Sequence, residues 1–198
     1  PRIDAITVQN YRAFAGPQKL ILRPLTLLYG GNNAGKSSLA RLLPLIADST
    51  SEDQAGALNL SSPAARGASF ADLLWRGRST SDDQRLHLTL HMAERQVHYA
   101  FDIYEDPIHN IPAQVIIRAF DITDASGAPF VGMRWTPPLS SPQRFEQILP
   151  AGPPILLSFR GLVPEGPGLA PEIARHVDPD HAAGDALAAL ELEETSLW

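Results

Sequence analysis

Residues Gly30–Ser37 carry the clearest chemical signal in the sequence. They read Gly-Gly-Asn-Asn-Ala-Gly-Lys-Ser and satisfy the pattern G-x-x-x-x-G-K-[ST] at every fixed position. In such a loop, successive backbone N–H groups form a nest for an anion, and glycine permits close approach to the ligand. Lys36 would reach the β- and γ-phosphates, and the Ser37 hydroxyl would ligate Mg²⁺. The segment therefore predicts a nucleotide but does not identify a reaction.

The segments on either side of this loop must position it. Leu25–Tyr29 is mostly apolar and predicts a strand buried on both faces of a mixed sheet. Beyond the loop, apolar residues at three- and four-residue spacing predict a helix that begins near Lys36: Leu39, Leu42, Leu43 and Ile46. The positive end of the helix dipole would favour a bound phosphate. The alternative is a Gly- and Asn-rich turn that matches the pattern by accident.

Lysine is rare in this chain, which makes its place in the loop informative. Of the sixteen Lys and Arg residues, only Lys19 and Lys36 are lysines. A lysine inside a Gly-rich turn suggests a role that needs a compact ammonium group rather than a guanidinium.

Periodic patterns predict the remaining elements. The expected strands are Ile3–Val8 and Gln18–Leu22 around a turn, a hairpin of Leu86–Met92 with Val97–Ile103, a second hairpin of Gln114–Thr123 with Phe130–Trp135, and Ile155–Phe159. The expected short helices are Phe70–Trp75 with Ser69 or Ala68 near its cap, Gln143–Leu149, and the Ala-, Leu- and Glu-rich end at Pro171–Glu194.

Together these elements predict an α/β fold of the P-loop NTPase type. A mixed sheet would surround the loop, with an antiparallel β-subdomain and a helical C-terminal segment. We expect a single domain over residues 1–198. Its parts would be a nucleotide-binding β–loop–α core at 1–47, a mobile surface loop at 48–68, a β-meander at 69–136, and a strand plus helical segment at 137–198.

Composition excludes several classes of protein. The chain has 198 residues, of which 44% are hydrophobic and 19% are charged, as in globular proteins. A net charge of −6 argues against a surface built wholly for nucleic acid. There is no cysteine, and no apolar run approaches the roughly 18 residues that span a bilayer. A cytoplasmic location without membrane contact is the expectation.

The opening of the chain resembles the start of ABC-type ATPase heads in the SMC, RecF and OLD group. The similar residues are ITVQNYRAFAG and LILRPLTLLYGGNNAGKSSLARLL. This group includes DNA-repair and anti-phage ATPases that begin with NF-x-x-F, an extended hairpin and an Asn-containing P-loop. SFADLLWRG and ILLSFRGLVPE are similar to later segments of such proteins. The resemblance is specific over residues 3–46 and weaker elsewhere.

The resemblance implies a set of roles around bound ATP and Mg²⁺. The residues around the triphosphate would be Gly30, Asn32, Asn33, Ala34, Gly35, Lys36, Ser37 and Ser38, with Ser37 as the Mg²⁺ ligand. Arg12 occupies a position that often faces the nucleotide, although a solvated turn arginine would look the same. Gln143 and Gln147 are poor candidates for the Mg²⁺-sensing glutamine of the family, and that role stays unassigned.

Two parts of the family's catalytic machinery have no counterpart in the sequence. The Walker B segment, an apolar strand ending in Asp-Glu, is imitated only by Val115–Asp121, which contains an arginine and lacks the glutamate, and by the helix-forming Ala188–Glu194. No Ser-Gly-Gly-like signature occurs either. In the family both belong to a C-terminal lobe, so we assign no catalytic residue here. We expect an N-terminal lobe that binds ATP without efficient hydrolysis.

The expected partner is a second ATPase head or a companion C-terminal lobe. DNA or an effector nuclease would bind through regions outside this chain. The leading hypothesis is thus a dimerising ATPase that serves DNA repair or antiviral defence. A non-catalytic nucleotide-sensing module is the alternative. A small P-loop kinase is a third hypothesis, which the antiparallel pattern over Leu86–Trp135 fits poorly.

Three histidines form the other notable cluster. His87 and His91 share one face of a predicted strand, and His98 lies on the next. Three imidazoles could bind a metal ion. Because no cysteine and no convincing carboxylate accompanies them, we interpret them as solvated strand histidines.

Overall fold

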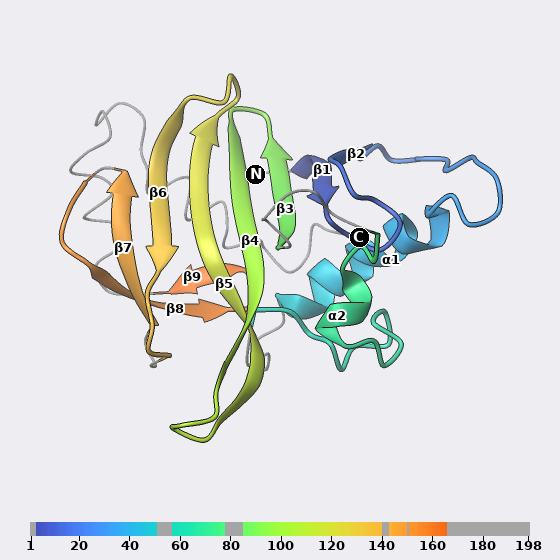
Figure 1. The fold of residues 1–198 in the computed structure, drawn as a ribbon. Coiled ribbons are helices and arrows are strands. Elements are labelled where there is room, and N and C mark those ends of the chain that lie inside the picture. Colours follow the sequence, from blue (N-terminus) through green and yellow to red (C-terminus); the bar gives the residue numbers. More distant parts are fainter. Residues whose placement is uncertain (1–2, 51–56, 78–84, 140–142, 150, 166–198) are drawn as a thin grey trace.

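The protein is built on one antiparallel sheet. The structure, a computed structural model, describes residues 3–50, 57–77, 85–139, 143–149 and 151–165. Its nine strands follow the order β2-β1-β3-β4-β5-β6-β7-β8-β9 (Figure 1). Their bounds are β1 Ile3–Gln9, β2 Gln18–Ile21, β3 Leu86–Met92, β4 Arg95–Asp106, β5 Ile111–Asp124, β6 Pro129–Trp135, β7 Gln143–Leu149, β8 Ile155–Arg160 and β9 Val163–Glu165.

Alternation along the strands gives the sheet one apolar and one polar face, since successive side chains point to opposite sides. One row of buried side chains crosses four strands in register: Val8, Leu88, Tyr99 and Phe120. The neighbouring row is polar: Thr7, Thr89, His98 and Asp121. The apolar face therefore forms the core, and the other face carries hydroxyls, imidazoles and charges.

Helix α1 (Lys36–Ser49) joins the core on the apolar side. Its buried side chains lie in the same cluster as the sheet's: Leu39, Leu42, Leu45 and Ile46. This confirms the helix predicted from the three- and four-residue spacing. A one-turn helix, α2 (Phe70–Leu73), follows and contributes Phe70 and Leu73 to the core. Both helices lie beside β1 and β3 at one end of the sheet (Figure 1).

Most of the predicted strands are confirmed. The two hairpins appear as β3–β4 and β5–β6, and the strand predicted at Ile155–Phe159 is β8. Strands β1 and β2 also form where the sequence places them. The segment Pro171–Glu194 lies outside the described residues.

The predicted α/β fold with a mixed sheet is wrong. Every strand pair in the described part of the chain is antiparallel, and that part contains two helices. The decisive segment is Leu25–Tyr29, which belongs to no strand. Leu25, Leu27 and Tyr29 are 75%, 61% and 85% exposed. An apolar run marks a buried strand only if a neighbouring strand pairs with it, and none of the described strands does so.

The helix predicted at Gln143–Leu149 is also wrong, because this segment is β7. Phe145 and Gln147 are buried while their neighbours are more exposed, a period of two. The residue types suit a helix, but pairing with β6 and β8 decides the structure.

The surface loop predicted at residues 48–68 is corrected where the structure describes it. Ala57, Leu58 and Ala65 are buried in the core cluster. The backbone N–H of Asn59 donates to Ser49 Oγ at 2.8 Å, so this segment is bound to the end of α1. The sequence does not predict this burial, because Ala and Ser occur both in surface loops and in tightly packed segments.

Candidate anion-binding site

The loop Gly30–Gly35 has the backbone geometry of a tight, left-handed turn. Gly30, Asn33 and Gly35 have φ values of 152°, 64° and 85°, a region that glycine adopts readily and asparagine tolerates. Gly30–Ala34 and Ser37 are exposed, whereas Gly35 and Lys36 are half-buried. The loop is thus open to a ligand on its outer side and supported on its inner side.

Helix α1 starts at this loop without a side-chain cap. Its N-cap is Gly35, and the first turn of this fully described helix has no acidic residue and no side-chain cap bond. Ser38 and Leu39 donate their N–H groups to Gly35 O at 3.0 and 3.1 Å. An uncapped helix start with its positive dipole end at an exposed loop favours an anion.

Lys36 closes over the loop from the helix side. Its ammonium donates to the carbonyl oxygens of Gly30 and Gly31 at 2.7 and 2.6 Å. These two bonds hold the positive charge at the loop. A bound phosphate would supply stronger, charged acceptors in their place.

The turn Tyr11–Phe14 supports the loop from beneath. Tyr11 is buried, and its hydroxyl donates to Ser38 O at 3.2 Å. A Cβ added to Gly35 would lie 2.3 Å from Phe14 Cζ, so this turn packs directly against the loop. The sequence pattern alone does not predict this support, although the aromatic pair Tyr11 and Phe14 is a signal for it.

Arg12 is placed toward α2. Its backbone, at φ 48°, donates from N–H to Leu73 O at 2.7 Å. Its guanidinium carbon lies 6.0 Å from the Tyr11 ring centroid, and its Nε is buried without a hydrogen-bond partner among the described residues. Its guanidinium forms no hydrogen bond to Gly30–Ser37 within the described residues. Its nucleotide-facing role stays a prediction.

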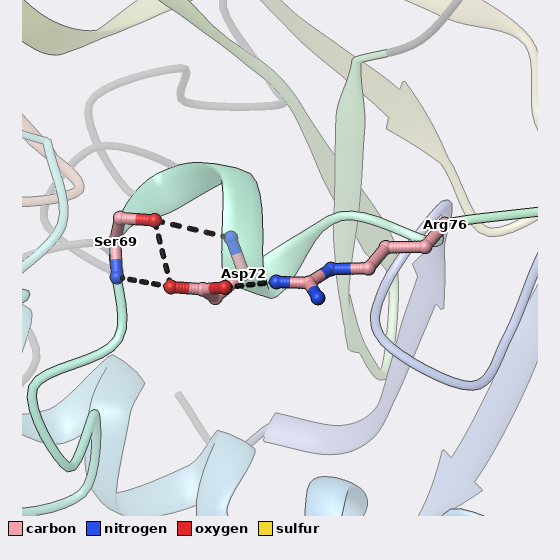
Figure 2. Close-up of polar contacts among 3 residues, drawn as sticks. All are labelled: Ser69, Asp72 and Arg76. Atoms are coloured by element: carbon pink, nitrogen blue, oxygen red, sulfur yellow. Dashed lines mark hydrogen bonds and ion pairs between the residues drawn. The ribbon is translucent and has the colours of Figure 1, made fainter.

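Helix α2 is fixed by a capping box, which steadies its contact with Arg12. Asp72 N–H donates to Ser69 Oγ at 3.3 Å, and Ser69 N–H donates to Asp72 Oδ2 at 3.0 Å (Figure 2). Arg76 forms an ion pair with the same carboxylate. Hydrogen bonds from Ser69 lower the pKa of Asp72. Ser69 is confirmed as the cap.

Acidic groups in the described residues do not gather into a metal site. No group of three His, Cys, Asp or Glu side chains there could hold a metal ion. Asp121, which ends the rejected Val115–Asp121 segment, forms an ion pair with Arg134 on β6. The role of Ser37 as a Mg²⁺ ligand stays a prediction.

His91 and His98 bond to threonines on the polar face. Thr7 Oγ1 lies 2.8 Å from His91 Nε2, and His98 lies between Thr89 and Thr123 at 3.0 and 3.1 Å. Hydroxyl partners on both ring nitrogens of His98 fit a structural role better than metal binding.

Stability is expected to fall as pH drops below about 6.5, the ordinary histidine pKa. Burial lowers the pKa of His91, and the charge of Lys19 lowers it further. Burial also lowers the pKa of His98, and the charge of Asp121 opposes this shift. The unfolded chain therefore binds these protons first, and stability is lost between the ordinary pKa and the lower folded value. Thermal unfolding at pH 7.5 and 5.5 measures this. A variant with His91→Gln and His98→Gln should lose less stability over the same range; an equal loss would contradict this account.

Tyr11→Phe is expected to lower the free energy of unfolding by about 1 kcal/mol, since it removes one buried hydroxyl bond to α1. For a domain of this size that is a fall of roughly 2–4 °C in melting temperature. Tyr29→Phe is the matched control, because Tyr29 is 85% exposed. Equal melting temperatures for the two variants would show that the Tyr11 bond to Ser38 O contributes nothing.

Comparisons with known protein families, with curated proteins and with solved structures gave no match. Across the described residues, no helix combines the length and the apolar character required to cross a membrane.

Proposed function

We propose that the chain binds Mg²⁺–ATP at Gly30–Ser37 as the N-terminal lobe of an ABC-type ATPase of the SMC, RecF and OLD group. The observation that carries the proposal is the combination at the start of α1: an exposed glycine loop, an uncapped helix N-terminus, and the Lys36 ammonium held at the loop carbonyls. These three features each favour a polyphosphate. The biological role would be DNA repair or anti-phage defence.

A companion lobe is part of the proposal. The segment before the loop exposes Leu25, Leu27 and Tyr29, while Leu22 and Leu28 pack partly against the core. Exposed apolar side chains close together offer a surface to a partner. An apolar surface of a C-terminal lobe or a second head would cover these side chains next to the phosphates. It would also bring the acidic residues that hydrolysis requires.

The kinase hypothesis is less well supported. Small P-loop kinases need alternating β-α units, whereas the described sheet is antiparallel throughout. The proposed function therefore rests on nucleotide binding and assembly rather than on transfer of phosphate to a metabolite.

Titration calorimetry with ATP tests the proposal. We expect one ATP bound per chain in Mg²⁺, weaker binding in EDTA, and negligible release of phosphate from the chain alone. Absence of binding at millimolar ATP would overturn the proposal. Robust turnover by the chain alone would refute the need for a companion lobe, and a phosphorylated metabolite in a product screen would favour a kinase.

A further inference from the structure

A cleft of about 580 Å³ lies between two parts of the chain that are distant in sequence. One wall is formed by Ala57–Ser61 and the start of α2, and the other by Ile103 of β4 and Ala113–Val115 of β5. No residue of Gly30–Ser37 lines this cleft, so it is separate from the phosphate loop. Its volume is within the range of about 300–1,000 Å³ that is usual for sites of small molecules.

The sheet side of the cleft is the apolar face of β4 and β5, continued beyond the core. Ile103 and Val115 are cross-strand partners, so their side chains lie next to each other on one face. Phe101 and Ile117 pair two residues further along on the same face and are fully buried in the core. Ile103, by contrast, is 42% exposed. The apolar face therefore extends past the part that the core covers, and the cleft lies over this uncovered part.

The opposite wall is held in place by hydrogen bonds within the protein. The backbone N–H of Asn59 donates to Ser49 Oγ at 2.8 Å, and its side-chain amide donates to Asp48 O at 3.3 Å. These bonds attach this wall to the end of α1. Ser69, at the start of α2, is held by its capping box with Asp72. Because the other side of the cleft belongs to the sheet, both sides are formed in advance, and a ligand would need to order little of the protein.

The lining of the cleft is uncharged and mainly apolar. Its larger apolar side chains are those of Leu58, Leu60, Phe70, Ile103 and Val115. Its polar residues are Asn59, Ser61, Ser69 and Gln114. The side chains of Asn59 and Ser69 already form hydrogen bonds within the protein. A charged ligand would lose its hydration here and gain no ionic partner from the lining. An apolar ligand would instead be stabilised by burial of its own surface and that of Ile103.

We propose that this cleft binds a small, uncharged and mainly apolar molecule. The concave shape favours a small molecule over the surface of a partner protein, since the uncovered Ile103 lies between two walls and not on a projecting patch. The proposal does not depend on nucleotide binding at Gly30–Ser37, so either can fail alone.

The test uses phenylnaphthylamine, an uncharged dye whose fluorescence rises in apolar surroundings, with the full chain. We expect saturable binding. Biphenylmethanol and biphenylcarboxylate, which share their two rings and differ in charge, then compete with the dye. The alcohol should displace the dye at a concentration at least about tenfold lower than the carboxylate, because the lining offers the charge no partner. Absence of saturable dye binding, or equal displacement by the two competitors, would overturn the proposal.

Two substitutions test the place of binding. Ala113→Glu adds a charge to the cleft, and Ile103→Gln removes part of its apolar floor. Both positions are exposed, so the fold should be preserved. We expect each variant to bind the dye at least about tenfold more weakly. Unchanged dye binding in both would refute the proposal.

Two further variants are the controls. Ala125→Glu, a change identical to Ala113→Glu at the exposed β5–β6 turn, should leave dye binding unchanged. Leu27→Gln changes the other exposed apolar segment, Leu25–Tyr29, and should also leave it unchanged. Loss of binding in Leu27→Gln alone would place the dye on that segment and contradict the assignment to the cleft.

Discussion

Lys36→Ala is expected to weaken Mg²⁺–ATP binding by roughly 100-fold or more, which corresponds to about 2.8 kcal/mol. The Lys36 ammonium lies at the carbonyl oxygens of Gly30 and Gly31, beside the N-terminus of α1, which has no side-chain cap. Charge-assisted bonds to phosphate are about twice as strong as neutral ones. The chain as a whole carries a net charge of −6, so attraction for a polyanion must come from this local group and the backbone dipoles.

Lys19→Ala is the matched control for this prediction. It removes the same charge from an exposed position on β2 and should leave the affinity within a factor of about two, because exposed distant charges are screened. Lys36→Arg keeps the charge but replaces a compact ammonium by a planar fork, and should also bind poorly. Calorimetry on the four proteins measures the effect. Equal losses for Lys36→Ala and Lys19→Ala would show that net charge alone matters and that the loop is not the site.

The candidate site could be predicted from sequence because its signal is local. Eight consecutive residues, Gly30–Ser37, specify the turn, the cation and the helix start together. The support from Tyr11 and Phe14 lies more than fifteen residues away along the chain, and no period links it to the loop. Contacts between residues so far apart in sequence depend on the tertiary structure, and a local motif does not predict them.

The strands could be predicted where alternation is strong, as in Leu86–Met92. Their arrangement could not, since a strand's pattern states which face is buried and leaves open which neighbour it pairs with. Leu25–Tyr29 shows the failure most clearly. Its apolar composition predicts burial, yet the described chain supplies no strand partner, and Leu25, Leu27 and Tyr29 are exposed.

Gly161→Ala is expected to destabilise the fold by about 3 kcal/mol or more. Gly161 and Leu162 connect β8 to β9 as a two-residue loop, and Gly161 has φ 57°, a position where hairpins favour glycine. A Cβ at this site would lie 1.4 Å from the carbonyl oxygen of Ser49, the last residue of α1. The obstacle is backbone, so no rotamer change can relieve it. Overpacking of this kind costs roughly 1–3 kcal/mol and the left-handed conformation a further 1–2 kcal/mol.

Gly67→Ala separates these two costs. Gly67 has a similar φ of 69°, but a Cβ there would meet nothing within 4 Å. It should therefore show the conformational cost alone, about 1–2 kcal/mol. In a domain of this size, 1 kcal/mol corresponds to about 2–4 °C in melting temperature. The melting temperature should therefore fall by roughly 6–12 °C for Gly161→Ala, and by about half as much or less for Gly67→Ala. If the two variants have equal melting temperatures, the β8–β9 loop does not pack closely against α1. The support of α1 at its C-terminal end must then come from Asn59, which bonds to Ser49 and Asp48, and from Ser62, which bonds to Asp48.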